Sequence, residues 1–95
     1  MTIDIKGVHY EVSDSVREKL ESKLKRVEHA EDMIVNLDFT ITREKQYKLE
    51  TNIHFRWGQV HHLKVETFDI WKGVDILIDK LEQKVDKEKE KVKHH

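Results

Sequence analysis

The chain has no cysteine, no proline and only three glycines among its 95 residues. Without cysteine it can form no disulfide bond, no thiolate metal site and no cysteine nucleophile. The lack of proline and the scarcity of glycine argue against a flexible linker between domains. No apolar run approaches the roughly 20 residues that a membrane-spanning helix needs, and no signal peptide is visible. We therefore expect one soluble, cytoplasmic domain over residues 1–95.

The chain also has little net charge. Lysine and arginine number 18, aspartate and glutamate number 19, and the formal net charge is −1, although 39% of the residues are charged. A protein with this balance is not attracted to nucleic acid as a whole molecule. An interface with a polyanion must therefore come from basic residues that are gathered in one place.

Four segments have the alternating apolar and polar pattern of a half-buried β-strand. They cover residues 2–12, with a break at Gly7, and residues 35–43, 47–56 and 60–67. The side chains expected on the inner face of the sheet are Ile3, Ile5, Val35, Leu37, Phe39, Ile41, Tyr47, Leu49, Thr51, Ile53, Phe55, Leu63 and Val65.

The register of the last hairpin decides which histidines meet. Pairing Ile53 with Leu63 keeps both apolar sets on one side, and it places His54 opposite His62 on the exposed side. Two imidazoles without a nearby third ligand make a poor zinc site. We therefore expect surface histidines there, and we expect no metal and no other cofactor.

Two further segments follow the helical period. Ser13 is a suitable N-cap for the first helix, and Asp69 is one for a long second helix that starts at Ile70. The apolar stripe of the first helix is expected to consist of Val16, Leu20, Leu24 and Val27. That of the second helix is expected to consist of Ile70, Val74, Leu77, Ile78, Leu81, Val85 and Val92.

The order of these elements is β-α-β-β-β-α, which predicts an α+β fold. Short turns join the last three strands, so we expect them to form an antiparallel meander. A four-stranded sheet with two helices packed on one face leaves its other face polar and exposed. The last five elements have the order of a double-stranded-RNA-binding domain, but a shared order is an analogy of fold and does not establish a function.

The second helix sorts its charges by sign. Spacings of 4, 3 and 4 residues place four lysines in one row beside the apolar stripe, at Lys80, Lys84, Lys87 and Lys91. The acids gather on a third face, at Asp75, Asp79, Glu82, Asp86 and Glu90. The first helix has its own basic row on the same hand of its apolar stripe, at Lys19, Lys23 and Arg26. A helix built only for solubility would mix its charges. Two sorted rows therefore favour a rod-like polyanion, such as RNA, over a merely solvated face.

Other candidate side chains have simpler explanations. Trp57 at the expected hairpin tip and Trp71 in the first turn of the second helix could each stack on a base. For Trp71 we instead expect core or half-buried packing, so Trp57 is the better candidate for an exposed aromatic. Asp75 and Asp79 are expected to be solvated, because the pattern places no nucleophile or base near them. The chain shows no Ser-His-Asp grouping and no glycine-rich phosphate loop. We therefore do not expect an enzyme.

Three segments resemble the short ribosome hibernation-promoting factors, also called ribosome-associated inhibitor proteins. The first is Ile3-Asp4-Ile5-Lys6-Gly7 followed by Val12-Ser13, and the second is the helix over residues 13–27. The third and most specific is Val65-Glu66-x-x-Asp69-Ile70-Trp71-x-x-Val74-Asp75-x-Leu77-Ile78-Asp79-Lys80-Leu81. The resemblance implies a protein that lies in the channel between the head and body of the small ribosomal subunit and contacts ribosomal RNA. Such a protein occludes the positions of mRNA and tRNA and inhibits translation in stationary phase or under stress.

The resemblance also implies which residues contact RNA. They are Lys23, Arg26, Lys80, Lys87, Lys89 and Lys91. Lys84 extends the row at a position where the family commonly has Gln, Gln83 stands in place of Arg, and Glu88 stands in place of an aromatic residue or His. The chain ends after the second helix, so we expect a monomer off the ribosome, without the C-terminal dimerisation domain of the long family members.

One alternative stays open, namely a double-stranded-RNA-binding module unrelated to ribosomes. Against it, residues 67–70, just before the second helix, contain no lysine or arginine. Neither reading implies a membrane or a small-molecule substrate as a partner.

Overall fold

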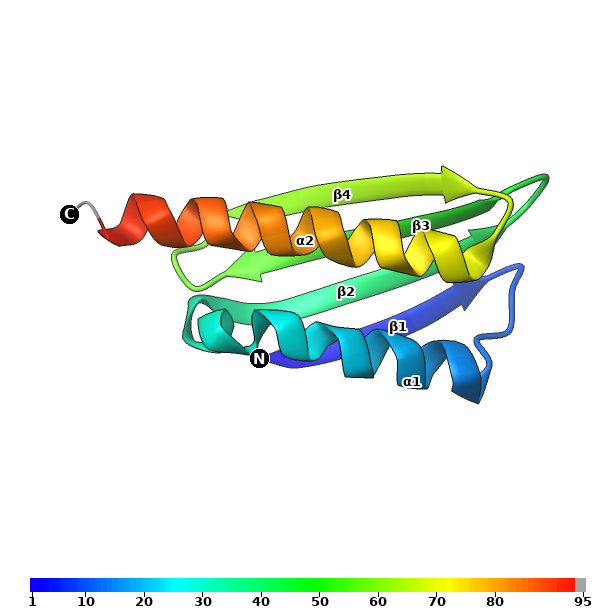
Figure 1. The fold of residues 1–95 in the computed structure, drawn as a ribbon, viewed down its shortest axis with the longest axis horizontal. Helices are drawn as coiled ribbons and strands as arrows, with labels where there is room; N and C mark the ends of the chain where they lie inside the picture. The colour runs from blue at the N-terminus through cyan, green and yellow to red at the C-terminus, as the bar shows by residue number, and fades with distance from the viewer. Residues whose placement is uncertain (94–95) are drawn as a thin grey trace.

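The computed structural model describes residues 1–93. The elements along the chain are β1 (Thr2–Val8), α1 (Asp14–Lys23), η1 (Leu24–Met33), β2 (Ile34–Arg43), β3 (Tyr47–Phe55), β4 (Val60–Thr67) and α2 (Ile70–Lys93), as Figure 1 shows. The predicted order β-α-β-β-β-α is confirmed, with the 3₁₀ helix η1 added between α1 and β2. The side chain of Val92, which the sequence assigns to the second apolar stripe, lies outside what the structure describes. Within residues 1–93, no helix is both long and apolar enough to cross a membrane.

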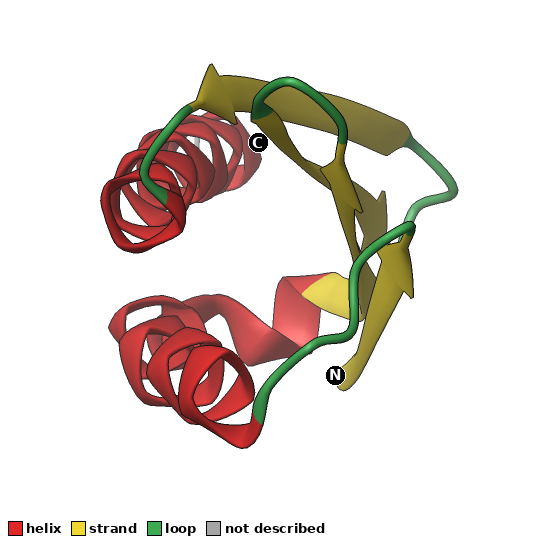
Figure 2. Ribbon diagram, turned by 90° about the vertical axis from the view of Figure 1, so that its right-hand side faces the viewer, coloured by secondary structure: helices red, strands yellow, loops and turns green. Residues whose placement is uncertain are grey.

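The four strands form one mixed sheet in the order β1-β2-β3-β4. β1 pairs with β2 in parallel, whereas β2, β3 and β4 pair antiparallel, so the predicted meander is confirmed. Figure 2 shows that α1 and α2 cover the same side of this curved sheet. The opposite face carries polar side chains, as the alternation in the strands predicts.

The two helices run in the same direction along the sheet (Figure 1). β1, β2 and β4 all point one way, because two successive antiparallel steps restore the direction. α1 follows β1 and α2 follows β4, so each helix returns antiparallel to its strand. The parallel course of α1 and α2 decides which of their faces meet.

The core lies between the helices and the inner face of the sheet. Its largest fully buried side chains are Phe39, Phe55, Leu20, Leu24, Leu37, Ile41, Leu49, Ile53, Leu77, Ile78, Leu81 and Val16. Each such aliphatic or aromatic side chain stabilises the fold by about 1.5–3 kcal/mol when it leaves water. The apolar stripe of the first helix, that of α2 from Ile70 to Val85, and most of the predicted inner face are therefore confirmed.

The start of β2 differs from the predicted pattern. Val35 was expected on the inner face, but 55% of its surface is exposed, and the neighbouring Ile34 is buried instead. The pairing with β3 shifts between Ile34 and Asn36, which is a β-bulge. A bulge inserts one residue into the alternation, so the side chains before it change sides.

The last hairpin also differs from the predicted register. Ile53 pairs with His61, not with Leu63, and His54 pairs with Val60, not with His62. The Phe55 amide donates to the Gln59 carbonyl at 2.9 Å, and Gly58 adopts a φ of 90°, so the turn closes earlier than expected. A shift of two residues keeps the apolar sets on one face, and it places His61 directly opposite Ile53 on that inner face.

The element ends follow local chemistry. β1 stops at Val8 rather than Val12, because His9 takes a positive φ and turns the chain. The Ser13 hydroxyl accepts a hydrogen bond from the Val16 amide, and the Asp69 carboxylate accepts one from the Trp71 amide, so both predicted N-caps are confirmed.

Candidate nucleic-acid interface

The basic row of α1 faces the acidic face of α2. Lys23 Nζ lies 2.9 Å from Asp75 Oδ1, and Lys19 Nζ lies 3.4 Å from the same oxygen. The hydrogen bond from Lys23 lowers the pKa of Asp75, burial opposes that shift, and the Lys19 charge adds to it. The Asp75 carboxylate is therefore ionised at neutral pH and holds two lysines of the neighbouring helix.

The same arrangement continues along the helices. Arg26 Nη2 lies 2.8 Å from Asp79 Oδ1, and Arg26 Nε lies 2.5 Å from Glu82 Oε2. His29 Nε2 lies 3.0 Å from Asp86 Oδ1. We call these contacts the interhelical ladder, formed by Lys19, Lys23, Arg26 and His29 with Asp75, Asp79, Glu82 and Asp86.

The ladder follows from the sorted charges and the parallel course of the helices. Each helix carries its basic row on the same hand of its apolar stripe, so two parallel helices on one sheet place the basic row of one against the acidic face of the other. The prediction that Asp75 and Asp79 are merely solvated is wrong, since both bind side chains of the other helix. The acidic face lies between the two basic rows, which therefore do not merge.

The predicted RNA contacts in α1 and η1 thus lie in a mixed environment. The side chains of Lys23 and Arg26 are 34% and 42% exposed, and their charged groups are directed to carboxylates. A phosphate could reach their exposed sides, but it would compete there with the acids of α2. The structure therefore separates these two residues from the lysines of α2.

The basic row of α2 lies along the other flank of that helix. We call Lys80, Lys84, Lys87 and Lys91 the α2 basic edge. Lys80 Nζ donates to the Lys64 carbonyl of β4 at 3.4 Å, which places this edge beside the last strand. Leu63 and Gln83 line a shallow groove together with Lys80, Lys84 and Lys87. Within residues 1–93, Lys80 and Lys87 form no ion pair.

Glu88 is a buried acid next to this edge. Its Oε1 atom lies 3.4 Å from Lys91 Nζ, 3.5 Å from Lys84 Nζ and 3.8 Å from His61 Nε2. The sequence identified Glu88 only as a departure from the family pattern. Its position three residues after Val85 in the apolar stripe was the signal that could have predicted its burial.

Lys89 does not belong to the α2 basic edge. It lies two residues from Lys87 and from Lys91, which is roughly 160° around a helix, so it occupies the opposite flank. Its side chain is partly buried there. The resemblance implied an RNA contact at this position, and the structure places it apart from the other lysines of α2.

The histidines of the exposed sheet face have separate partners. His54 Nε2 lies 2.8 Å from Asp38 Oδ2, and His62 Nδ1 lies 2.8 Å from Asn52 Oδ1. Burial would raise the pKa of Asp38, but hydrogen bonds from His54 and Asn36 hold it below its usual range. No cluster of three or more potential ligands that could hold a metal ion occurs within the described chain.

The comparison with known proteins decides the family. The family model described as "Sigma 54 modulation protein / S30EA ribosomal protein" matches residues 3–93. The chain belongs to this family. The resemblance to ribosome hibernation-promoting factors is therefore confirmed over nearly the whole sequence.

Several relatives of the S30EA family are similar over their full length. A ribosome hibernation promoting factor of Pseudomonas putida is 36% identical over 92 residues, which cover 96% of this chain and 89% of the relative. The one from Azotobacter vinelandii is 33% identical over 92 residues, covering 96% and 85%. The one from Escherichia coli K12 is 29% identical over 96 residues, covering all of both chains. The chain thus belongs to the family of the ribosome hibernation promoting factors, which is non-enzymatic.

Solved structures agree with the fold. A ribosomal subunit interface protein from Coxiella burnetii has a TM-score of 0.85 and 30% identity, and the match covers 94% of this chain and 98% of that one. The N-terminal domain of Protein Y from Thermus thermophilus has a TM-score of 0.77 and 23% identity, covering 90% and 96%. At that identity the second match supports the fold alone.

The two tryptophans of this S30EA family member are both about half exposed. Trp57, at 45%, stacks on the buried Phe55 ring with 4.8 Å between the centroids. Trp71, at 43%, carries the Lys19 ammonium 5.1 Å from its ring centroid. Trp57 is exposed as predicted, and Trp71 takes part in the contact between α1 and α2.

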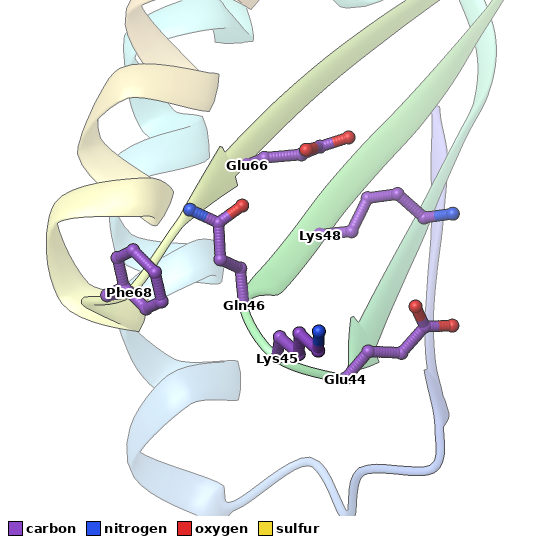
Figure 3. Close-up of a pocket in the computed structure, with 6 residues that line it drawn as sticks. All are labelled: Glu44, Lys45, Gln46, Lys48, Glu66 and Phe68. Carbon is purple, nitrogen blue, oxygen red and sulfur yellow. The ribbon is translucent and has the colours of Figure 1, made fainter.

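A separate pocket lies at the far end of the sheet, beside the β2–β3 turn. Figure 3 shows its lining residues, which are Glu44, Lys45, Gln46, Lys48, Glu66 and Phe68. Two lysines and two glutamates balance each other's charge, and the exposed Phe68 forms one wall. This pocket therefore has no net attraction for a polyanion, unlike the α2 basic edge.

Proposed function

We propose that this chain binds the small ribosomal subunit in the channel that mRNA and tRNA use, and that it inhibits translation in the cytoplasm in stationary phase or under stress. Membership of the S30EA family supports a ribosomal partner. The Coxiella burnetii relative is a ribosomal subunit interface protein, which supports a site between the subunits. Ribosomal RNA is then the polyanion that the sorted charges require.

The observation that carries this proposal is the position of the α2 basic edge. Of the two basic rows, it is the one that does not face the acids of the other helix. Four lysines over three turns form a line of positive charge suited to the phosphates of one RNA strand. We assign the main RNA contacts to Lys80, Lys84, Lys87 and Lys91, with secondary contacts at the exposed sides of Lys23 and Arg26 and at Lys89.

The mechanism is occupancy. A small rigid domain fills space that mRNA and tRNA need, and it is held by phosphate contacts and by shape rather than by reading bases. No bond is made or broken, so no catalytic group is required. The chain acts as a monomer in this proposal, because one copy presents the whole α2 basic edge.

Charge reversal tests the proposal. The double variant Lys80→Glu and Lys87→Glu changes two exposed residues that lie off the apolar stripe and do not pair with Glu88, so it should keep the fold. It should lose cosedimentation with ribosomes from starved cells and no longer inhibit cell-free translation, because binding depends on phosphate contacts.

The matched control is the double variant Lys25→Glu and Lys45→Glu, which changes the net charge equally at two exposed residues elsewhere. It should bind and inhibit nearly as the unmodified chain does. Equal losses from the two double variants would mean that overall charge, and not the α2 basic edge, determines binding.

A further inference from the structure

A buried carboxylate, that of Glu88, lies beneath the lysines of the α2 basic edge. Glu88 occupies the apolar stripe of α2, seven residues after Leu81 and three after Val85, and only 4% of its surface is exposed. The stripe before it is apolar, and a leucine would fit that pattern. A buried carboxylate is strongly unfavourable unless it is paired, so its pairing must be part of its role.

Three nitrogen atoms lie within 4 Å of one oxygen of this carboxylate, and two of them belong to lysines. Lys91 Nζ, Lys84 Nζ and His61 Nε2 lie 3.4, 3.5 and 3.8 Å from Glu88 Oε1. Burial alone would raise the pKa of Glu88, but Lys91 and Lys84 hold it below its usual range, so the carboxylate is charged at neutral pH. Burial, followed by the nearby Lys84, lowers the pKa of His61, so its imidazole is neutral. The cluster therefore holds two positive charges and one negative charge.

We propose that Glu88 is a positioning residue that fixes Lys84 and Lys91 and, as a permanent internal counter-ion, limits the affinity of the α2 basic edge for RNA phosphates. That RNA is the ligand of the α2 basic edge rests on the proposed function. The electrostatic effect of Glu88 rests only on the contacts within the cluster. Glu88 is too deeply buried to touch a phosphate, so it acts only through the two lysines.

The physical argument concerns the charge that a phosphate meets. Affinity for RNA comes largely from neutralising phosphates with lysines and releasing their bound cations. A lysine that already shares a carboxylate contributes less of this neutralisation. A phosphate within contact of Lys84 or Lys91 would also lie only about 6–7 Å from the Glu88 carboxylate, which repels it. Glu88 thus reduces the number of phosphates that the edge neutralises.

A purely structural role makes a different prediction. If Glu88 served only to hold the end of α2 in place, removing its charge would weaken binding or leave it unchanged. The salt dependence of binding would then stay the same, because the number of phosphates neutralised would not change. Affinity and salt dependence together therefore separate the two roles.

The test is Glu88→Gln, which keeps the shape and an acceptor oxygen but removes the charge. Binding to purified ribosomes should tighten about three- to tenfold at moderate salt. The plot of log affinity against log salt should become steeper by up to about one unit, corresponding to one more neutralised phosphate. The matched control is Glu21→Gln, which removes an exposed acid of α1 and should leave both quantities unchanged.

Two further measurements keep every outcome informative. If the unmodified chain does not bind ribosomes, the proposed function fails, and the effect of Glu88 is read from salt elution on heparin-agarose, a general polyanion. Later elution of Glu88→Gln supports the inference there, and equal or earlier elution overturns it.

If Glu88→Gln does not fold, Glu88→Leu replaces it, and it too should bind more tightly. Unchanged or weaker binding of a folded variant, or loss of the fold in both, would overturn the inference.

Discussion

Lys23 and Asp75 join the two helices through a 2.9 Å contact between the ammonium group and the carboxylate. The contact lies on the outer side of the helix layer, where both side chains are partly exposed. It belongs to a row of charge pairs that runs along both helices above the apolar core. The pairing uses all three residues of the first basic row, Lys19 and Lys23 in α1 and Arg26 in η1. This row is therefore an internal contact as well as a candidate surface.

The core should not tolerate truncation on the face between the sheet and the helices. Leu37→Ala in β2 and Leu77→Ala in α2 should each lower the free energy of unfolding by about 2–5 kcal/mol, because both side chains are fully buried. Urea denaturation of each variant measures this loss. Val35→Ala, at the exposed bulge, should cost less than about 0.5 kcal/mol. A large loss at Val35 with small losses at the two leucines would show the opposite face to be the core.

The interhelical ladder should contribute modestly to stability. A double-mutant cycle with Arg26→Ala and Asp79→Ala should give a coupling energy of about 0.2–1 kcal/mol, because partly exposed pairs gain little over their hydrated states. The coupling should shrink in high salt, which screens exposed charges. Glu82 remains a partner of Arg26 in the Asp79 variant, so the cycle isolates only one pair. A coupling energy of zero at low salt would remove this pair from the ladder.

Stability should fall as the pH drops below neutral, and His61 should cause part of that fall. Its pKa is lowered in the folded chain by burial and by Lys84, whereas it is about 6.5 in an unfolded chain. The unfolded state therefore binds the proton first, and the contribution of His61 is complete above about pH 6.5 and is lost as the pH falls toward the folded-state pKa. Unfolding free energies between pH 8 and pH 5 should show a flatter profile for His61→Gln. An identical profile would contradict the role of His61.

Gly73 should resist replacement even though it lies inside a helix. A Cβ atom at this position would lie 2.5 Å from Thr67 Cγ2 and 3.0 Å from Leu49 Cδ1. Alanine is a better helix former by about 1 kcal/mol, but the overlap should outweigh this gain and give a net loss of about 1–2 kcal/mol. Thermal unfolding measures the difference. Lys72→Ala, at an exposed neighbour, should change stability by less than about 0.5 kcal/mol, and a stabilised Gly73→Ala would show that α2 can move away from β3.

The regular parts of the fold could be predicted because periodicity is a local signal. The stripe from Val74 to Val85 and the alternation from Leu37 to Ile41 each repeat several times, so single irregular residues do not hide them. The bulge at Val35 and the register of the last hairpin each depend on one backbone irregularity. No repeating pattern in the sequence predicts these irregularities.

The candidate site could be predicted only in part for a different reason. The sequence showed that both helices sort their charges on the same hand, but the meaning of this pattern depends on the relative direction of the helices. Between parallel helices a basic row meets an acidic face, as it does at Arg26 and Asp79. The burial of Glu88 was not predicted, although its helical position places it with Leu81 and Val85.

The parallel course of α1 and α2 also polarises the molecule. Pairing between the helices offsets the charges in the middle of the layer, and within residues 1–93 it leaves Lys80 and Lys87 on the α2 flank without an ion pair. Positive charge is therefore concentrated on that flank, although the formal net charge is only −1. A polyanion attracts this flank more strongly than the acidic face beside it, which favours encounters with the α2 flank in front. A domain with almost no net charge can thus approach RNA already oriented for binding.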